Sequence, residues 1–271
     1  MKSTKAFTVI ELLVVVIIIA VLSAMLLPAL AATKGNSQKI YCINNLKQIG
    51  LAFRTWEASH NSRYPQAVSY SSGGANEYCG HANGAGITAP NPNNPGMVFM
   101  VMSNQLVTPK VLFCPADNYH WAGNGYATNF SYGDLLGCST PVAGQRAPQS
   151  GMTKISYFIN GDASEADPQD VMTGDGNIGN QTATANNGAA SYRFGASATS
   201  QPSSPVTPVQ LSATAWGVGA GAWAWTANDL HQKSGNLGMA DGSCQSVSIS
   251  GLHTYLQNST NSAMCAFNFP E

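Results

Sequence analysis

Apolar side chains near the N-terminus form one long run. Between residues 12 and 32 there is no charged residue, and only Ser23 and Pro28 interrupt the apolar character. About 20 apolar residues are enough for a helix to cross the hydrocarbon core of a bilayer. Lys2 and Lys5 precede the run, and basic residues keep the adjoining end of a membrane helix in the cytoplasm. The pattern predicts a membrane helix with the rest of the chain on the extracytoplasmic side.

Glu11 stands at the head of this apolar run. An ionisable side chain in such a place is costly, so it marks a functional site by default. A conventional secretory signal is the alternative, because residues 29–31 (ALA) resemble a signal peptidase site. Such signals have an apolar region of only ~7–15 residues. The longer run and the acidic residue favour a retained helix.

The spacing of apolar residues changes after residue 32. They now recur at steps of three and four, which is typical of an amphipathic helix; the series is Ile40, Ile43, Leu46, Ile49 or Gly50, Phe53 and Trp56. Asn45 and its polar neighbours fall on the remaining surface. We predict one helix over residues 7–60, with a membrane part (7–32) and an amphipathic part (33–60). Pro28 is its expected kink, and Gly35 with Asn36 is a second weak point.

Residues 61–271 show a different pattern, of short strands separated by long loops. The segments KVLFC, KISYFIN and VMTGD predict strands, and GMVFMVMS is compatible with helix or strand. Residues 180–208 predict a long surface loop. Two half-alternating runs flank Asp241-Gly242, which is the strongest local signal for a hairpin. The prediction is an α+β fold, with a small antiparallel sheet packed on the second half of the long helix.

Charge is sparse in this chain of 271 residues. Charged residues make up 9%, against about 25% in an average soluble protein, and polarity comes largely from Asn, Ser, Thr, Gln and Gly. This composition favours a loop-rich extracellular protein. The chain has no Lys/Arg-rich patch, which argues against nucleic acid as a partner.

Six cysteines are scattered along the chain without a C-x-x-C pair or zinc-like spacing. In an exported chain they predict at least one disulfide, and the sequence does not choose among the pairings. Buried thiols are the alternative for some of them. The candidates are Cys42, Cys79, Cys114, Cys138, Cys244 and Cys265.

The N-terminal segment AFTVIELLVVVIIIAVLSAMLLPAL resembles the signal segment of type IV pilins and type II secretion pseudopilins. The residues that match are Ala6, Phe7, Thr8, Glu11, Leu12, Leu13 and Pro28. Ala6 stands where the family usually has glycine. Three later segments are similar to a large pseudopilin-like group with an H-X9-DG signature: CINNLKQIGLAF (42–53), FCPAD (113–117), and His231 with Asp241 and Gly242.

The resemblance implies a structural subunit that is the substrate of an enzyme rather than an enzyme, with no certain cofactor. A prepilin peptidase would remove the leader (1–6) between Ala6 and Phe7 and N-methylate Phe7. An inner-membrane assembly platform would then move the subunit from membrane lipid into a helical filament of its own copies or of other pseudopilins. Glu11 would pair with the amino group of a neighbour's Phe7. The globular head (61–271) would face the periplasm, as part of a pilus-like filament or a secretion pseudopilus.

Residues of the head suggest further sites, each with a structural alternative. Oxygen-rich loops bind Ca²⁺, and several pseudopilins similar to this chain are calcium-stabilised, so Asp162, Asp167 and Asp175 are candidate ligands; a solvated loop is the alternative. His231 and Asp241 could form a metal pair or a catalytic dyad. The structural alternative is that His231 hydrogen-bonds a nearby loop and Asp241 stabilises the turn.

Aromatic residues suggest a second class of function. Trp216, Trp223 and Trp225 could stack on a sugar or fill the core. A membrane-anchored, extracytoplasmic ligand- or sugar-binding module is therefore the alternative function.

Overall fold

The structure is a computed structural model. It describes residues 8–79, 81, 95–117, 126–131, 134–135, 154–181, 189–190, 194, 209–211, 215–216, 221–227, 230–259 and 265–269. The chain forms two compact units, Met1–Gln38 and Lys39–Glu271. The leader residues Met1–Ala6, Phe7, Cys138 and most of the predicted loop 180–208 lie outside the described residues.

A single helix, α1 (Val9–Glu57), contains both the membrane part and the amphipathic part predicted from the sequence. It stays helical through Pro28 and Gly35, the two predicted weak points. The helix ends at Glu57, shortly before the predicted stop, and the left-handed backbone angles of Asn61 and Ser62 (φ 55° and 56°) prevent a right-handed helix from continuing beyond them. Among the described residues, α1 is the one helix long and apolar enough to cross a membrane.

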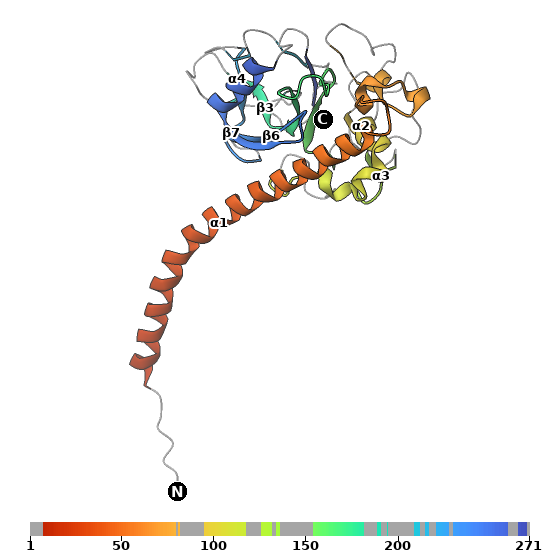
Figure 1. Cartoon of the computed structure of the whole chain (residues 1–271). Coiled ribbons are helices and arrows are strands. Elements are labelled where there is room, and N and C mark those ends of the chain that lie inside the picture. The colour runs from red at the N-terminus through yellow and green to blue at the C-terminus, as the bar shows by residue number, and fades with distance from the viewer. Residues whose placement is uncertain are drawn as a thin grey trace. The chain divides into compact units, whose positions relative to one another are not determined.

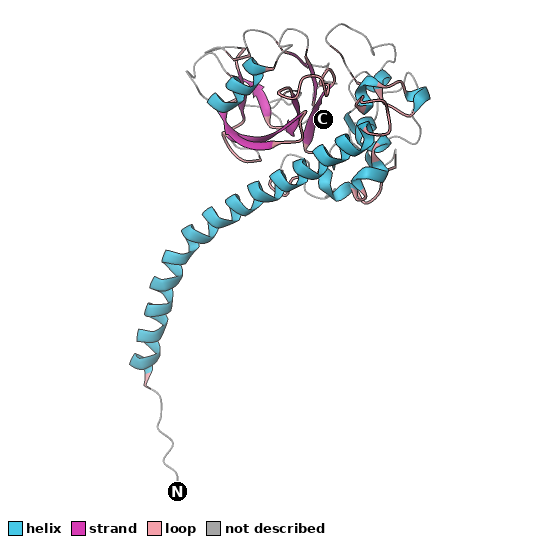
Figure 2. Cartoon of the chain, in the orientation of Figure 1, coloured by secondary structure: helices cyan, strands magenta, loops and turns pink. Residues whose placement is uncertain are grey.

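The second unit holds a six-stranded antiparallel sheet (Figure 2). Its strand order is β4 (Val209–Gln210), β8 (Ala266–Asn268), β1 (Tyr157–Asn160), β2 (Val171–Asp175), β6 (Ser234–Met239) and β7 (Cys244–Ser248). β3 (Ile178–Asn180) and β5 (Trp223–Trp225) form a separate antiparallel pair. α4 (Ile249–Asn258) follows β7 directly and contacts both β5 and β7 (Figure 1). The α+β fold predicted from the sequence is therefore confirmed.

The hairpin predicted at Asp241-Gly242 is confirmed. β6 and β7 pair from Ser234↔Ser248 to Gly238↔Cys244, and Met239 and Ser243 close the turn through a 2.8 Å main-chain hydrogen bond. Gly242 has φ 86°, a left-handed angle that glycine adopts without steric cost. The Asp241 carboxylate accepts a 2.7 Å hydrogen bond from the Ser243 N–H and so fixes the turn.

Short helices connect α1 to the sheet. They are η1 (Pro65–Ala67), η2 (Tyr70–Ser72), η3 (Asn76–Tyr78), α2 (Pro95–Val101), α3 (Ser103–Leu106) and η4 (Pro109–Leu112). The strand predicted at KVLFC is wrong, because this segment forms η4. Pro109 occupies the first turn, and the Thr108 side chain accepts a hydrogen bond from the Lys110 N–H, which together start a helical turn.

The amphipathic half of α1 supplies the core between helix and sheet. Leu46, Ile49 and Phe53 are fully buried in one cluster with Tyr157 and Ile159 of β1. Other buried side chains of the sheet form a second hydrophobic cluster. It includes Trp223 and Trp225, which are 3% and 0% exposed. Core packing, rather than a sugar-stacking face, therefore accounts for these two tryptophans.

Candidate functional site

The N-terminus of α1 is closed by a reciprocal pair of side-chain contacts. The Glu11 carboxylate accepts hydrogen bonds from the Thr8 N–H (2.8 Å) and the Thr8 hydroxyl (2.7 Å), while Thr8 Oγ1 lies 3.3 Å from the Glu11 N–H. This is a capping box, in which a Thr and a Glu three residues apart satisfy the free N–H groups of the first turn. Ala6 and Phe7, the predicted processing residues, lie outside the described residues. Glu11 thus has a partner within its own chain before any second subunit is present.

The side chains that follow Glu11 are mostly apolar, and they are exposed on every face of the helix. The large apolar residues from Val9 to Leu30 are 47–82% exposed within this chain. Pro28 lies inside the helix and is also exposed. Helices that are apolar all round are found in a membrane or packed among other helices. This segment therefore requires lipid or partner helices.

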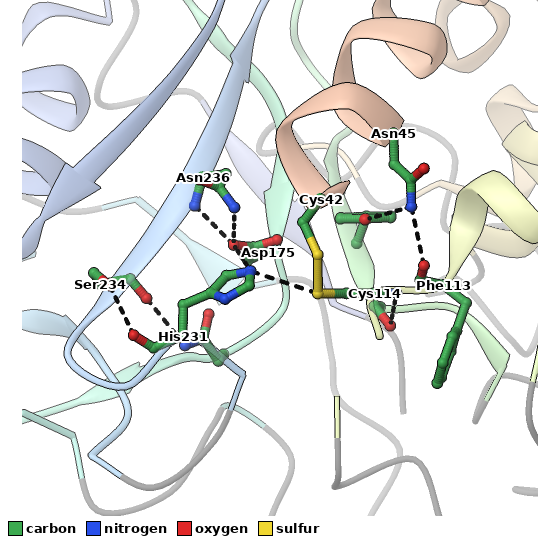
Figure 3. Close-up of a disulfide and its surroundings, with 11 residues drawn as sticks. Cys42, Asn45, Phe113, Cys114, Asp175, His231, Ser234 and Asn236 are labelled. Atoms are coloured by element: carbon green, nitrogen blue, oxygen red, sulfur yellow. Dashed lines mark hydrogen bonds and ion pairs between the residues drawn. A yellow bond between two sulfur atoms is a disulfide. The ribbon is translucent and has the colours of Figure 1, made fainter. Parts of the chain in front are cut away.

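A second candidate site lies in the head unit, at a disulfide between Cys42 of α1 and Cys114 just after η4 (Figure 3). The predicted disulfide is confirmed, and the structure supplies the pairing that the sequence left open. Both cysteines are fully buried, and their Cα atoms are 5.4 Å apart. The bond closes a loop of 72 residues and joins the amphipathic half of α1 to the segment that precedes β1.

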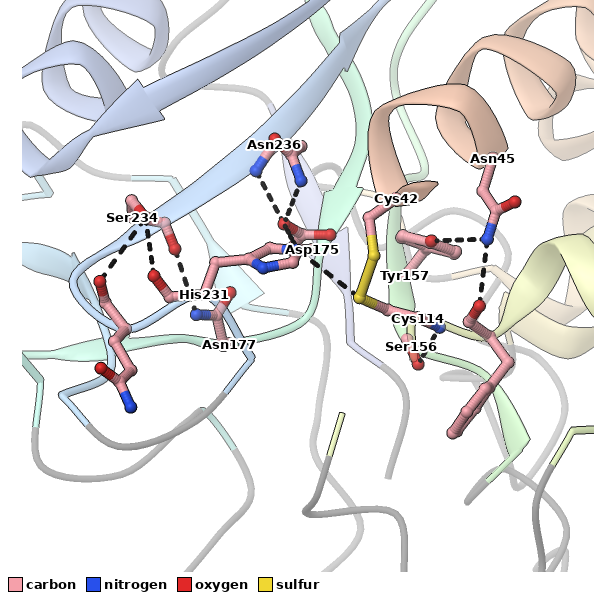
Figure 4. Close-up of polar contacts among 12 residues, drawn as sticks. Cys42, Asn45, Cys114, Ser156, Tyr157, Asp175, Asn177, His231, Ser234 and Asn236 are labelled. Atoms are coloured by element: carbon pink, nitrogen blue, oxygen red, sulfur yellow. Dashed lines mark hydrogen bonds and ion pairs between the residues drawn. A yellow bond between two sulfur atoms is a disulfide. The ribbon is translucent and has the colours of Figure 1, made fainter. Parts of the chain in front are cut away.

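His231 and Asp175 lie beside this disulfide (Figure 4). His231 Nε2 is 3.5 Å from Cys114 Sγ and 3.6 Å from Asp175 Oδ2. The Asp175 carboxylate accepts hydrogen bonds from the Asn236 N–H (2.7 Å) and the Asn236 side-chain amide (2.9 Å). The carboxylate that faces His231 is therefore that of Asp175, at the end of β2, whereas the Asp241 carboxylate serves the hairpin turn.

Asn45 forms a polar bridge from α1 to the same region. Its side-chain amide donates to the Phe113 carbonyl oxygen (3.0 Å; Figure 3) and to the Tyr157 hydroxyl (3.2 Å; Figure 4). Asn45 is only 3% exposed, so its predicted place on the helix surface is wrong. About three to four positions in every two turns of such a helix face the core, and periodicity alone did not separate a buried amide from an exposed one.

Residues of three segments (42–53, 113–117 and 231–242) therefore meet in one place. Cys42 and Asn45 come from the first segment, Cys114 from the second and His231 from the third. The first and third also meet at a pair of glycines, since a Cβ added to Gly50 would lie 3.4 Å from the Gly242 Cα. Residues that are 68 to 117 positions apart in the sequence are thus brought into contact where the head meets the helix.

Burial shapes the acid–base behaviour of His231. Its removal from water lowers its pKa to about 4; the nearby positive charge of Lys39 acts in the same direction, and Asp117 opposes it. The imidazole is therefore neutral at neutral pH. A neutral ring nitrogen beside sulfur can accept a proton or bind a metal ion.

The stability of the head should fall when the pH is lowered from 6.5 to about 4. In this window the unfolded state takes up a proton on His231 that the folded state excludes, so protonation favours unfolding. The contribution is absent above pH 6.5 and reaches about 3 kcal/mol near pH 4. We expect urea unfolding of the full-length chain in detergent micelles to give a lower free energy of unfolding at pH 4.5 than at pH 7. In His231→Gln most of this difference should disappear; an equal difference in the variant would contradict the assignment.

The predicted calcium ligands have separate partners. The Asp162 carboxylate accepts a hydrogen bond from the Ala266 N–H (2.8 Å) and lies 3.1 Å from His81 Nδ1. The Asp175 carboxylate accepts a hydrogen bond from the Asn236 N–H. Asp167 lies in a turn held by main-chain hydrogen bonds. Within the described part of the chain, Cys42, Cys114 and His231 are the group of three close enough to share a metal ion. Calcium binding by the acidic loop stays a prediction.

The remaining described cysteines are not joined in disulfides with one another. Cys79 and Cys265 are buried and Cys244 is half-buried. Burial raises the pKa of the Cys244 thiol to about 11 and that of the Cys265 thiol to about 12. Protonated thiols are poor nucleophiles, so these cysteines act as packing side chains rather than as reactive thiols.

Asp175 and Asn236 are the functional candidates that the sequence did not single out for this site. Asp175 was grouped with the acidic loop because of its neighbours in sequence, and only the pairing of β2 with β6 places it against His231. The one signal that the sequence offers is the position of Asp175, an acidic residue at the end of β2, a strand whose residues are all buried.

Comparison with known proteins identifies the N-terminal segment. Residues 1–27 match the family model of the prokaryotic N-terminal methylation motif. No curated protein and no solved structure matches the chain. The motif is that of precursors which a prepilin peptidase processes, and together with the apolar helix it indicates a membrane-anchored precursor. Residues 1–27 thus carry the prepilin-type methylation motif of type IV pilin-like proteins.

Proposed function

We propose that the chain is a structural subunit of a type IV pilus-like filament or of a type II secretion pseudopilus. Prepilin peptidase cleaves it before Phe7 and methylates the new amino group. The subunit rests in the inner membrane with its head in the periplasm, and it then enters a filament through its apolar helix. The observation that carries the proposal is the methylation motif at residues 1–27, placed at the start of a 49-residue helix.

The chemistry of the helix start supports this role. Cleavage before Phe7 creates a positively charged amine one residue before Thr8, which caps the helix. Glu11 is a negative charge in a segment that needs an apolar environment. A carboxylate in such surroundings is strongly destabilising unless a cation and hydrogen-bond donors accompany it. Thr8 supplies donors but no charge, so a neighbour's amine would complete the site and select subunits in register.

The head supports an extracytoplasmic location. Disulfides form and persist in oxidising compartments and are rare in the cytosol. Cys42 and Cys114 are joined, and they lie after the apolar part of the chain. A head that carries this bond fits export to the periplasm, with Lys2 and Lys5 left on the cytoplasmic side.

Mass spectrometry of the N-terminus tests the proposal. The chain is produced in bacteria with and without an active prepilin peptidase. With the enzyme we expect the mature protein to begin at Phe7 and to carry one additional methyl group. Ala6→Gly should be processed at least as completely, whereas Ala6→Leu should accumulate as the precursor because its side chain no longer fits a site for small residues. A mature protein that begins at Ala32 in all variants would show signal peptidase cleavage and refute the proposal.

A further inference from the structure

Four side chains from four different segments converge beside the disulfide. Cys42 Sγ, Cys114 Sγ and His231 Nε2 all lie within 4.8 Å of one another, and all three residues are buried. Asp175 Oδ2, on a fully buried carboxylate, is 3.6 Å from His231 Nε2. Two thiolates and an imidazole are donors that are typical of zinc sites.

The distances fit a tetrahedral ion. Zn²⁺ binds sulfur at about 2.3 Å and nitrogen at about 2.0–2.1 Å, so tetrahedral geometry places a sulfur and a nitrogen ligand about 3.6 Å apart. The corresponding distance here, from Cys114 Sγ to His231 Nε2, is 3.5 Å. The edge from Cys114 Sγ to His231 Nε2 is thus already in place. The sulfur–sulfur edge, about 3.8 Å, becomes available when the two sulfurs are not bonded to each other.

Surrounding groups hold the donors in position. Two hydrogen bonds from Asn236 orient the Asp175 carboxylate, and the Cys114 N–H donates to Ser156 Oγ (3.0 Å; Figure 4). Cys42 is fixed by α1, whose next turn is anchored through Asn45. Outer contacts of this kind orient the ligands of metal sites and raise their affinity.

We propose that, in its dithiol state, the chain binds a Zn²⁺-class ion through Cys42, Cys114 and His231, with Asp175 beside His231 as a positioning residue. Binding displaces one proton from each thiol and requires no electron transfer. Disulfide formation instead removes two protons and two electrons from the same thiols, and the electrons pass to a second disulfide by thiol–disulfide exchange. The metal and the disulfide therefore exclude each other. Each joins α1 to the segment after η4, so the head is fixed on the helix before oxidation as well as after it.

Cobalt binding tests the proposal. The full-length chain in micelles is reduced with a phosphine under anaerobic conditions, and Co²⁺ is added as a spectroscopic substitute for Zn²⁺. We expect one equivalent of Co²⁺ to give a thiolate-to-metal absorption band with the visible bands of a tetrahedral site, and Zn²⁺ to displace it. The disulfide form should give neither band. Cys114→Ser should weaken the thiolate band, and His231→Gln and Asp175→Asn should each lower the affinity by about tenfold or more.

Cys244→Ser is the matched control, because Cys244 is a half-buried cysteine in β7 outside the cluster. It should bind Co²⁺ as the wild type does. Circular dichroism of each reduced, metal-free variant shows whether the variant is folded. If a variant is unfolded, the Co²⁺ spectrum of the wild type tests the proposal alone, because two thiolates in a tetrahedral site give a characteristic band position and intensity. Absence of these bands in the reduced wild type, or equal loss in Cys244→Ser, would overturn the proposal.

Discussion

Glu11→Gln should leave cleavage before Phe7 intact and strongly reduce filament assembly. The amide has the volume of the carboxylate and keeps an oxygen for the two hydrogen bonds from Thr8, so the helix still begins correctly. It lacks the negative charge that would pair with the amine of a neighbour. Charge-assisted hydrogen bonds are about twice as strong as neutral ones, so loss at every subunit contact should reduce filament yield by more than about tenfold.

Thr8→Val is the matched control for this experiment. It has nearly the same shape as threonine and removes the hydroxyl donor, but it keeps the main-chain N–H bond and the charge of Glu11. Filaments should still form, as counted in electron micrographs of cells that overproduce each variant. If Glu11→Gln assembles as well as the wild type, pairing between subunits is not the role of Glu11. If Thr8→Val fails as completely as Glu11→Gln, the contact within the chain is what matters.

The elements that the sequence predicted well are those in which a local pattern decides the structure. The apolar run and the three-and-four spacing predicted α1, and Asp241-Gly242 predicted the β6–β7 hairpin, because a left-handed turn position requires a residue such as Gly242. The strand predicted for the segment KVLFC was wrong, and the reason is also local. Its apolar residues fit a short strand, but Thr108 and Pro109 start a helical turn, and this capping signal outweighs three apolar residues.

The site in the head was only partly predictable, because contacts between distant segments create it. Cys42 and Cys114 were two of six equivalent candidates, and only the packing of α1 on β1 brings them together. His231 was noted for its spacing to Asp241, but the fold directs it toward Asp175 instead. The pattern of one segment carries no information on which partner the chain topology will provide.

Cys42→Ser should destabilise the head strongly. The disulfide closes a loop of 72 residues, and the chain-entropy relation gives about 4 kcal/mol for a loop of this length. Both cysteines are fully buried, so the new hydroxyl is also removed from water, which adds a desolvation cost. We expect urea unfolding of the full-length chain, measured in micelles with a metal chelator, to show a loss of several kcal/mol. Cys244→Ser should stay within about 0.5 kcal/mol of the wild type, since Cys244 is half-buried.

Reduction separates the effect of the covalent link from that of the substitution. If the link is the cause, the reduced wild type should be destabilised nearly as much as Cys42→Ser, and the reductant should not change the variant further. The loss should also appear locally, because the bond anchors α1 where it meets the segment before β1. Amide hydrogen exchange should therefore rise first in α1 around Cys42 and Asn45, while the β6–β7 hairpin keeps its protection. An unchanged stability on reduction would mean that packing and the Asn45 bridge alone hold the head on the helix.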